Sequence, residues 1–263
     1  MPLLDPPLLT LLTDFGTADY YVAAVKGVVL SLAPRARIVD LGHDIAPGDV
    51  LAASFLLAAV APLYPPGTVH LAVVDPGVGS ARRILLVERD RSLYLAPDNG
   101  LLTPLLTAAE TRSVERPDLH REAPGQTFHG RDRFAPIAAA LLGGALPASL
   151  GPVITDPVRI ERPAPHHQGR EIHGHVVHVD RFGNLVTDIP ASWLDSGVYR
   201  VGVAGHETGL AVGHYAELPP DAAGYLAGSL GTVELALCGA SLALAWDVHR
   251  GAAVRIERMV LSD

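Results

Sequence analysis

Residues 8–16, LLTLLTDFG, decide the predicted fold. The apolar run stops at Asp14 and a glycine, which is typical of a buried strand that ends in a turn. Residues 68–79, TVHLAVVDPGVG, repeat the pattern, with a β-branched run that stops at Asp75 before a glycine-rich turn. We therefore expect each of these two aspartates at the carboxyl end of a strand.

The segments between and after these runs alternate between helical and strand-like patterns. Apolar residues recur at helical spacing in 20–32 and in 49–63, the second with Asp49 as its N-cap, and strand 37–41 separates the two. Strand alternating with helix indicates an α/β fold with a mainly parallel sheet covered on both faces. The other elements predicted for this half are a hairpin of 84–87 with 92–96 and helices over 101–109 and 134–142.

Composition divides the chain near residue 159. Residues 159–169, RIERPAPHHQG, are rich in proline and polar side chains, as interdomain linkers are. We expect an N-terminal α/β catalytic domain over 1–158 and a smaller C-terminal β domain over 170–263. Short apolar runs in this second part predict strands at 173–179, 185–189, 199–203, 232–237 and 253–259. Their regular spacing favours a small antiparallel sheet or barrel.

Composition also narrows the function classes. The formal net charge of -8 argues against a nucleic-acid partner, because binding to phosphates depends on clustered lysine and arginine. Cys238 is the sole cysteine, which excludes an intrachain disulfide and favours a reducing, cytoplasmic setting. We expect no membrane partner, because the apolar stretch 50–63 is too short to span a bilayer. The prolines and the early aspartate near the N-terminus argue against a secretory signal.

The two strand ends are the first candidate for chemistry. In an open parallel sheet, ligands bind beyond the carboxyl ends of the strands. Asp14 and Asp75 are both expected there, so two carboxylates would face one crevice. Either aspartate alone is equally well explained as a turn or helix cap, but the pair favours a site. A carboxylate in this position can accept hydrogen bonds from both hydroxyls of a ribose.

A loop dense in polar groups precedes the last predicted helix of this half. Residues 126–134, QTFHGRDRF, combine His129 with two arginines, an aspartate and two aromatic rings, and such loops are disproportionately functional. His129 is either a structural residue or a site residue, and its charged neighbours favour the second interpretation. Arg82 and Arg83 follow the glycine-rich turn, and one of them either pairs with Asp75 or forms a surface salt bridge.

Other signals do not support a site. Residues 77–79, GVG, lack the third glycine and the helix start of a dinucleotide fingerprint. The histidines over 173–180 are spaced along a predicted strand so that only His173 and His175 share a face, which argues against zinc. The residues by themselves therefore predict an α/β enzyme that acts on a small molecule.

Five motifs, in order along the chain, carry a resemblance to a known family. Together they resemble the S-adenosyl-L-methionine (SAM) hydrolases, also called SAM hydroxide adenosyltransferases, which are similar to fluorinase and chlorinase. The resemblance implies hydrolysis of SAM to adenosine and L-methionine by in-line attack of water on the ribose C5′, with no metal or other cofactor. The motifs are LLTDFG at 11–16, VVDPGVGSARR at 73–83, APDNGLL at 96–102, FHGRDRFAP at 128–136 and DRFGNLVTDI at 180–189.

The resemblance also implies roles for individual residues. An Asp-Arg-His triad that holds the attacking water maps to Asp75, Arg82 and His129. Asp14 would bind both ribose hydroxyls, and Phe128 would line the nucleoside pocket. The family forms trimers with active sites between subunits, so we expect a homotrimer. The residues of the second domain that would contact methionine and adenine are Asp180, Phe182, Asn184, Ser229, Glu234, Leu237 and Gly239.

The chain differs from the halogenating relatives at three positions, and these differences help to decide between a hydrolase and a halide transferase. These relatives carry an aromatic residue at the place of Gly48, a tyrosine at that of Asp75 and a serine at that of Gly130. The chain therefore resembles a hydrolase more than a SAM-dependent halide transferase. Leu230 stands where the family has an aromatic residue or arginine, which leaves the adenine contacts there open. A noncatalytic SAM or adenosine sensor is the other alternative, and the intact triad argues against it.

Overall fold

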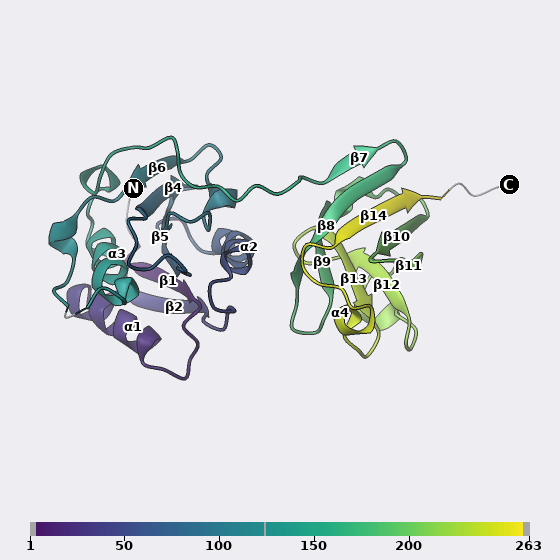
Figure 1. Cartoon of the computed structure of the whole chain (residues 1–263), viewed down its shortest axis with the longest axis horizontal. Helices are drawn as coiled ribbons and strands as arrows, with labels where there is room; N and C mark the ends of the chain where they lie inside the picture. Colours follow the sequence, from purple (N-terminus) through teal and green to yellow (C-terminus); the bar gives the residue numbers. More distant parts are fainter. Residues whose placement is uncertain (1–3, 124, 260–263) are drawn as a thin grey trace. The chain divides into compact units, whose positions relative to one another are not determined.

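The computed structural model describes residues 4–123 and 125–259. Contacts within the chain divide it into two compact units, Met1–Ile160 and Glu161–Asp263, and Figure 1 shows a separate sheet in each. No helix in the described part of the chain is both long enough and apolar enough to cross a bilayer.

The first unit is built on a six-stranded sheet with the order β2-β1-β3-β5-β4-β6. Strands β2, β1, β3 and β5 run parallel, while β4 is antiparallel to both β5 and β6. The predicted mainly parallel sheet and the predicted hairpin are therefore confirmed, and β1 and β3 are neighbours. The bounds are β1 (Leu8–Thr13), β2 (Arg37–Gly42), β3 (Val69–Val73), β4 (Ile84–Arg89), β5 (Ser92–Pro97) and β6 (Glu110–Ser113).

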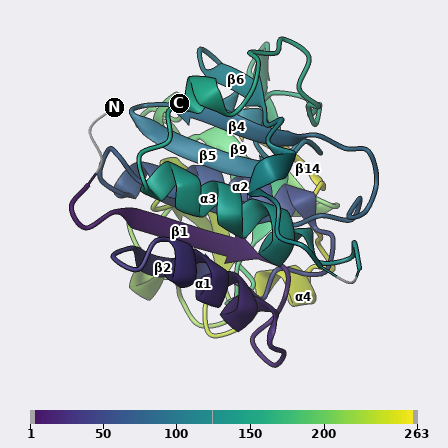
Figure 2. The ribbon, with the colours of Figure 1, turned by 90° about the vertical axis from the view of Figure 1, so that its left-hand side faces the viewer.

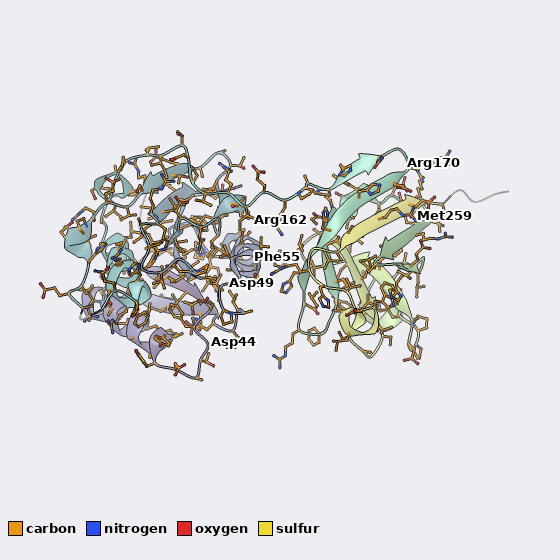
Figure 3. All side chains as sticks on the ribbon, viewed as in Figure 1. Asp44, Asp49, Phe55, Arg162, Arg170 and Met259 are labelled. Atoms are coloured by element: carbon orange, nitrogen blue, oxygen red, sulfur yellow. The ribbon has the colours of Figure 1, made fainter. Side chains whose placement is uncertain are left out.

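Helices cover both faces of this sheet. Alternate residues of the strands belong to two separate hydrophobic clusters, one for each face. Helices α1 (Tyr21–Leu32) and α3 (Ala135–Leu142) share the first cluster, and Figure 2 shows them on one face of the sheet. Helix α2 (Val50–Val60) belongs to the second cluster. Asp49, labelled in Figure 3, directly precedes α2 as its N-cap. Its carboxylate accepts a hydrogen bond from the N–H of Ala52.

The predicted helix over 101–109 is wrong. The segment contains only a short 3-10 turn, Thr103–Leu105, and its leucines are buried in the same cluster as α2. A short apolar run does not by itself separate a buried helix from a buried loop. Nor does the sequence predict β6, because its residues ETRS are mainly polar.

The second unit is an antiparallel, barrel-like sheet of eight strands, with the order β11-β10-β14-β8-β9-β13-β12 and β7 paired to β8. The five predicted strands are confirmed as β8, β9, β10, β13 and β14. Part of the segment 159–169, predicted as a linker, forms β7 instead. The bounds are β7 (His166–Gln168), β8 (Glu171–Val179), β9 (Leu185–Pro190), β10 (Tyr199–Val203), β11 (His206–Thr208), β12 (Ala223–Ala227), β13 (Thr232–Leu237), α4 (Leu242–Ala245) and β14 (Ala253–Arg258).

Candidate active site

A pocket of about 720 Å³ lies at the carboxyl ends of β1 and β3 in the first unit. The structure brings Asp14, which follows β1, and Asp75, which follows β3, to this one pocket. Phe128 and His129, from the loop before α3, also line it. Four of the residues singled out in the sequence therefore meet here, although they are far apart in the chain.

Arg82 links Asp75 to His129 in the wall of the pocket. Its Nε lies 2.7 and 2.8 Å from the two carboxylate oxygens of Asp75, and its Nη2 contacts Asp75 and lies 3.0 Å from Nδ1 of His129. The side chains of Asp75 and Arg82 are only 5% and 8% exposed, so this is a buried ion pair and not a surface salt bridge. Asp75 and His129 line the pocket whereas Arg82 does not, so Arg82 holds the other two in place.

His129 is held as a neutral imidazole. The Arg82 guanidinium only donates hydrogen bonds, so Nδ1 of His129 accepts one and the ring proton lies on Nε2. Burial, together with the charges of Arg133 and Arg82, lowers the pKa of His129 below its ordinary value. Nε2 is buried and has no hydrogen-bond partner among the described residues. This N–H is therefore an unsatisfied donor, which a molecule bound beside it would satisfy.

A π turn, Gly130–Phe134, leads from His129 into α3. Such turns widen the helix locally and are frequent at functional sites. A Cβ atom at Gly130 would lie 3.1 Å from the ring of Phe15 and 3.3 Å from that of Phe128. A side chain at this position would therefore require the two rings to move by a few tenths of an ångström.

Four aromatic rings form one wall of the pocket. The rings are those of Phe15, Tyr20, Tyr21 and Phe128, and five of their six pairs have centroids 4.6 to 6.3 Å apart. Sequence reasoning missed the two tyrosines, although they stand side by side where α1 begins, directly after the turn that follows β1. A pocket lined by both aromatic rings and carboxylates suits a ligand with an apolar part and a polar part.

Three further residues hold the strand ends in place. Gly48 donates its N–H to Oδ2 of Asp14 at 2.8 Å, and the side-chain amide of Asn99 donates to the carbonyl of Val74 at 2.8 Å. Arg83 pairs with Asp98 and Asp156 at 2.7 and 2.9 Å. Of the two adjacent arginines, Arg82 is thus the one that pairs with Asp75.

A second pocket, also of about 720 Å³, lies in the second unit. It collects five of the seven residues that the resemblance assigned to methionine and adenine, while Ser229 and Glu234 are not part of its lining. The lining residues are Asp180, Phe182, Asn184, Tyr215, Leu237, Gly239, Ala240 and Ser241.

Asp180 shapes the turn that carries the motif DRFGN. Its Oδ1 accepts hydrogen bonds from the N–H groups of Phe182 and Asn184 at 2.8 Å each, and its Oδ2 accepts one from the Asn184 side chain at 2.9 Å. Gly183 adopts a φ of +85°, and a Cβ atom there would overlap the side chain of Ser241. Much of the hydrogen-bonding capacity of Asp180 is therefore used within its own turn.

Tyr215 is a lining residue that sequence reasoning missed, because it is an isolated aromatic residue outside every motif. Its hydroxyl donates to Oε1 of Glu234 at 2.5 Å. Burial and this hydrogen bond raise the pKa of Tyr215 to about 12, and burial also raises the pKa of Glu234. Glu234 thus acts on the pocket through Tyr215, by fixing the orientation of its ring.

The described residues contain no group of three or more side chains able to hold a metal ion. In the histidine-rich region, His173 stacks on His166 and lies 3.0 Å from a carboxylate oxygen of Glu171. Together these contacts form a polar patch on two paired strands.

Comparison with known proteins shows to which family this chain belongs. Family models of the SAM hydroxide adenosyltransferase N-terminal and C-terminal domains match residues 9–151 and 174–255. The chain belongs to the SAM hydroxide adenosyltransferase family. Among its relatives, an (R)-S-adenosyl-L-methionine hydrolase of Salinispora arenicola is 37% identical over 95% of this chain and 97% of its own length. A fluorinase of Nocardia brasiliensis is 28% identical over 95% of this chain and 97% of its own length.

The fold of this chain is also similar to that of a solved structure. An uncharacterized conserved protein from Thermotoga maritima superposes with a TM-score of 0.88 at 32% identity, covering 95% of this chain and all of that one. The pocket residues Asp14, Asp75 and His129 lie within the matched N-terminal family domain, and Asp180 and Asn184 lie within the C-terminal one.

Proposed function

We propose that this chain hydrolyses SAM to adenosine and L-methionine. The observation that carries the proposal is a single pocket lined by Asp14, Asp75 and His129, in which the buried Arg82 links Asp75 to His129 from behind the lining. The hydrolase names of relatives that are 36–39% identical support it.

The reaction needs little help at the leaving group. The sulfonium departs as a neutral thioether, so neither a general acid nor a metal is required at sulfur, and SAM is the substrate with no further cofactor. The C5′–S bond breaks with its electron pair going to sulfur, while a water oxygen forms the new C5′–O bond. Catalysis then depends on holding that water in line with the breaking bond, at roughly 3 to 3.5 Å from C5′.

Asp75, Arg82 and His129 have different roles in holding and activating this water. His129 donates its Nε2–H to the water oxygen, because its Nδ1 is already committed to Arg82. Asp75 accepts a hydrogen bond from the water and takes its proton as the C5′–O bond forms. Arg82 keeps both groups in position through its hydrogen bonds to Asp75 and His129. Because the lone pair of Nδ1 faces Arg82 and Nε2 carries the proton, the imidazole has no free lone pair for the water, and Asp75 is the proton acceptor.

Asp14 and the aromatic wall provide binding. The Asp14 carboxylate, fixed by the N–H of Gly48, accepts hydrogen bonds from the two ribose hydroxyls. The rings of Phe15 and Phe128 contact the nucleoside. Asn184 and Tyr215 of the second unit meet adenine, and Asp180 meets the methionine ammonium with its remaining capacity. In a homotrimer, these contacts come from the neighbouring subunit.

Halide transfer is the competing reaction. The Asp75 carboxylate lies in the pocket and would repel a halide ion, and the rings of Phe15 and Phe128 leave little room for a serine at position 130. Both observations favour water as the nucleophile.

Product analysis tests the proposal. The protein is incubated with SAM, alone and with chloride or fluoride, and the products are separated by chromatography. We expect adenosine and methionine in equal amounts under all conditions. A 5′-halo-5′-deoxyadenosine product would establish the halide transferase instead, and tight SAM binding without any product over hours would establish a sensor.

A further inference from the structure

Next to the turn that contains Asp14, four polar side chains form a continuous series of contacts. Nζ of Lys26 lies 2.6 Å from Oδ2 of Asp40, and Nε2 of His43 lies 3.1 Å from Oδ1 of the same carboxylate. Nδ1 of His43 then lies 2.8 Å from Oγ1 of Thr13, and that hydroxyl oxygen accepts the N–H of Phe15 at 3.3 Å. This series of contacts connects α1 and β2 to the residue that follows Asp14.

The donors and acceptors along this series of contacts are compatible. Asp40 attracts the Nε2–H of His43, a close contact that is not aligned as a full hydrogen bond. Nδ1 of His43 is then the acceptor for the Thr13 hydroxyl, whose oxygen keeps a lone pair for the N–H of Phe15. Burial opposes ionisation of Asp40, but the contacts with Lys26 and His43 lower the pKa of Asp40 below its ordinary value.

The loop that contains His43 also holds the turn through its backbone. The carbonyl of His43 accepts the N–H of Gly16 at 2.8 Å, and Gly48 of the same loop donates to the Asp14 carboxylate at 2.8 Å. The side chain of His43 is only 4% exposed and that of Thr13 is fully buried. The turn 14–16 is therefore attached to this loop both through His43 and through Gly48.

We propose that His43 is a positioning residue, which acts through Thr13 and the loop to aim the Asp14 carboxylate at the 2′ and 3′ hydroxyls of the nucleoside. This inference rests on the proposed function, because Asp14 must be the group that binds the diol. It assigns His43 a role in selectivity for the diol, beyond its contribution to the stability of the fold.

The same strand supplies a matched control. Thr10 of β1 is also fully buried, and its Oγ1 lies 2.8 Å from Nδ1 of His70, a buried histidine on β3. Thr10–His70 and Thr13–His43 are thus the same kind of pair at the same distance. His70 stacks on Tyr94 within the sheet and is not part of the pocket lining.

The experiment measures the affinity for adenosine and for 2′,3′-dideoxyadenosine by calorimetry, and takes the ratio of the two dissociation constants. The variants are His43→Ala and Thr13→Val, with His70→Ala and Thr10→Val as their controls. Because hydrogen bonds to a carboxylate are strong, we expect the wild type to prefer adenosine by about tenfold or more. His43→Ala and Thr13→Val should lower that preference by about three- to tenfold, while the controls keep the wild-type ratio.

The outcomes separate this inference from the proposed function. A merely structural role would lower the melting temperature or the active fraction but leave the ratio unchanged. A wild-type ratio retained by both His43→Ala and Thr13→Val, or an equal loss in the controls, would overturn the role of His43. If Asp14→Ala itself leaves the ratio unchanged, the assignment of Asp14 to the diol fails, and the role of His43 fails with it.

Discussion

Arg82 carries the geometry of the reaction centre, because its guanidinium contacts both Asp75 and His129. We predict that Arg82→Ala lowers kcat by about two orders of magnitude, since both partners lose their orientation. Arg83→Ala is the control, because Arg83 pairs with Asp98 and Asp156. It should keep kcat within about twofold, with a loss of stability only. Steady-state kinetics with thermal melting curves check this, and near wild-type kcat in Arg82→Ala would contradict it.

The pH profile reports the state of His129. Its pKa is lowered from 6.5, so the neutral form persists as the pH falls below that value, and activity is lost only as the pH falls through the lowered pKa. We predict an acidic limb of kcat/KM below pH 6.5. Arg133→Gln removes a positive charge that lowers this pKa, so its limb should move to higher pH. A limb at or above pH 6.5, unmoved in Arg133→Gln, would show that another group titrates.

At the level of elements, strongly patterned segments were predictable and weakly patterned ones were not. The apolar runs that became β1 and β3 ended at charged turn residues, so the positions of Asp14 and Asp75 followed from the sequence. The edge strand β6 and the buried loop at 101–109 depend on tertiary packing, which leaves no periodic signal.

The site was predictable to a similar extent. The motifs pointed to Asp75, Arg82 and His129, but the neutral state of His129 depends on its burial and on the direction of the Arg82 guanidinium. Tyr215 belongs to the second pocket only because the fold brings its loop beside the DRFGN turn. No local pattern marks such a residue.

The turn that carries DRFGN depends on a glycine. Gly183 has φ +85° and no space for a Cβ atom beside Ser241, so Gly183→Ala introduces both backbone strain and overlap. We predict a loss of at least about 2 kcal/mol in the free energy of unfolding. Gly169→Ala is the matched control, since Gly169 has φ +64° and open space around it. It should lose about 1 kcal/mol. Denaturant unfolding measures both, and equal losses would contradict the role of the overlap.

At the level of the whole molecule, the proposed homotrimer makes a prediction about mixed oligomers. Asp75 lines the first pocket and Asn184 the second, so we expect Asp75→Ala to inactivate the first and Asn184→Ala to weaken binding in the second. If an active site combines the first unit of one subunit with the second unit of its neighbour, unfolding and refolding the two variants together restores some wild-type sites. We expect the mixture to regain a substantial fraction of wild-type activity, while each variant refolded alone does not. No gain on mixing would mean that each site is built within one chain.

In the proposed reaction, a water molecule held by Asp75 and His129 attacks C5′ of the substrate. Hydrolysis of SAM in ¹⁸O-labelled water, followed by mass spectrometry of both products, tests it most directly. We expect one labelled oxygen in adenosine, at O5′, and none in methionine. Adenosine without the label, or a labelled methionine, would contradict it.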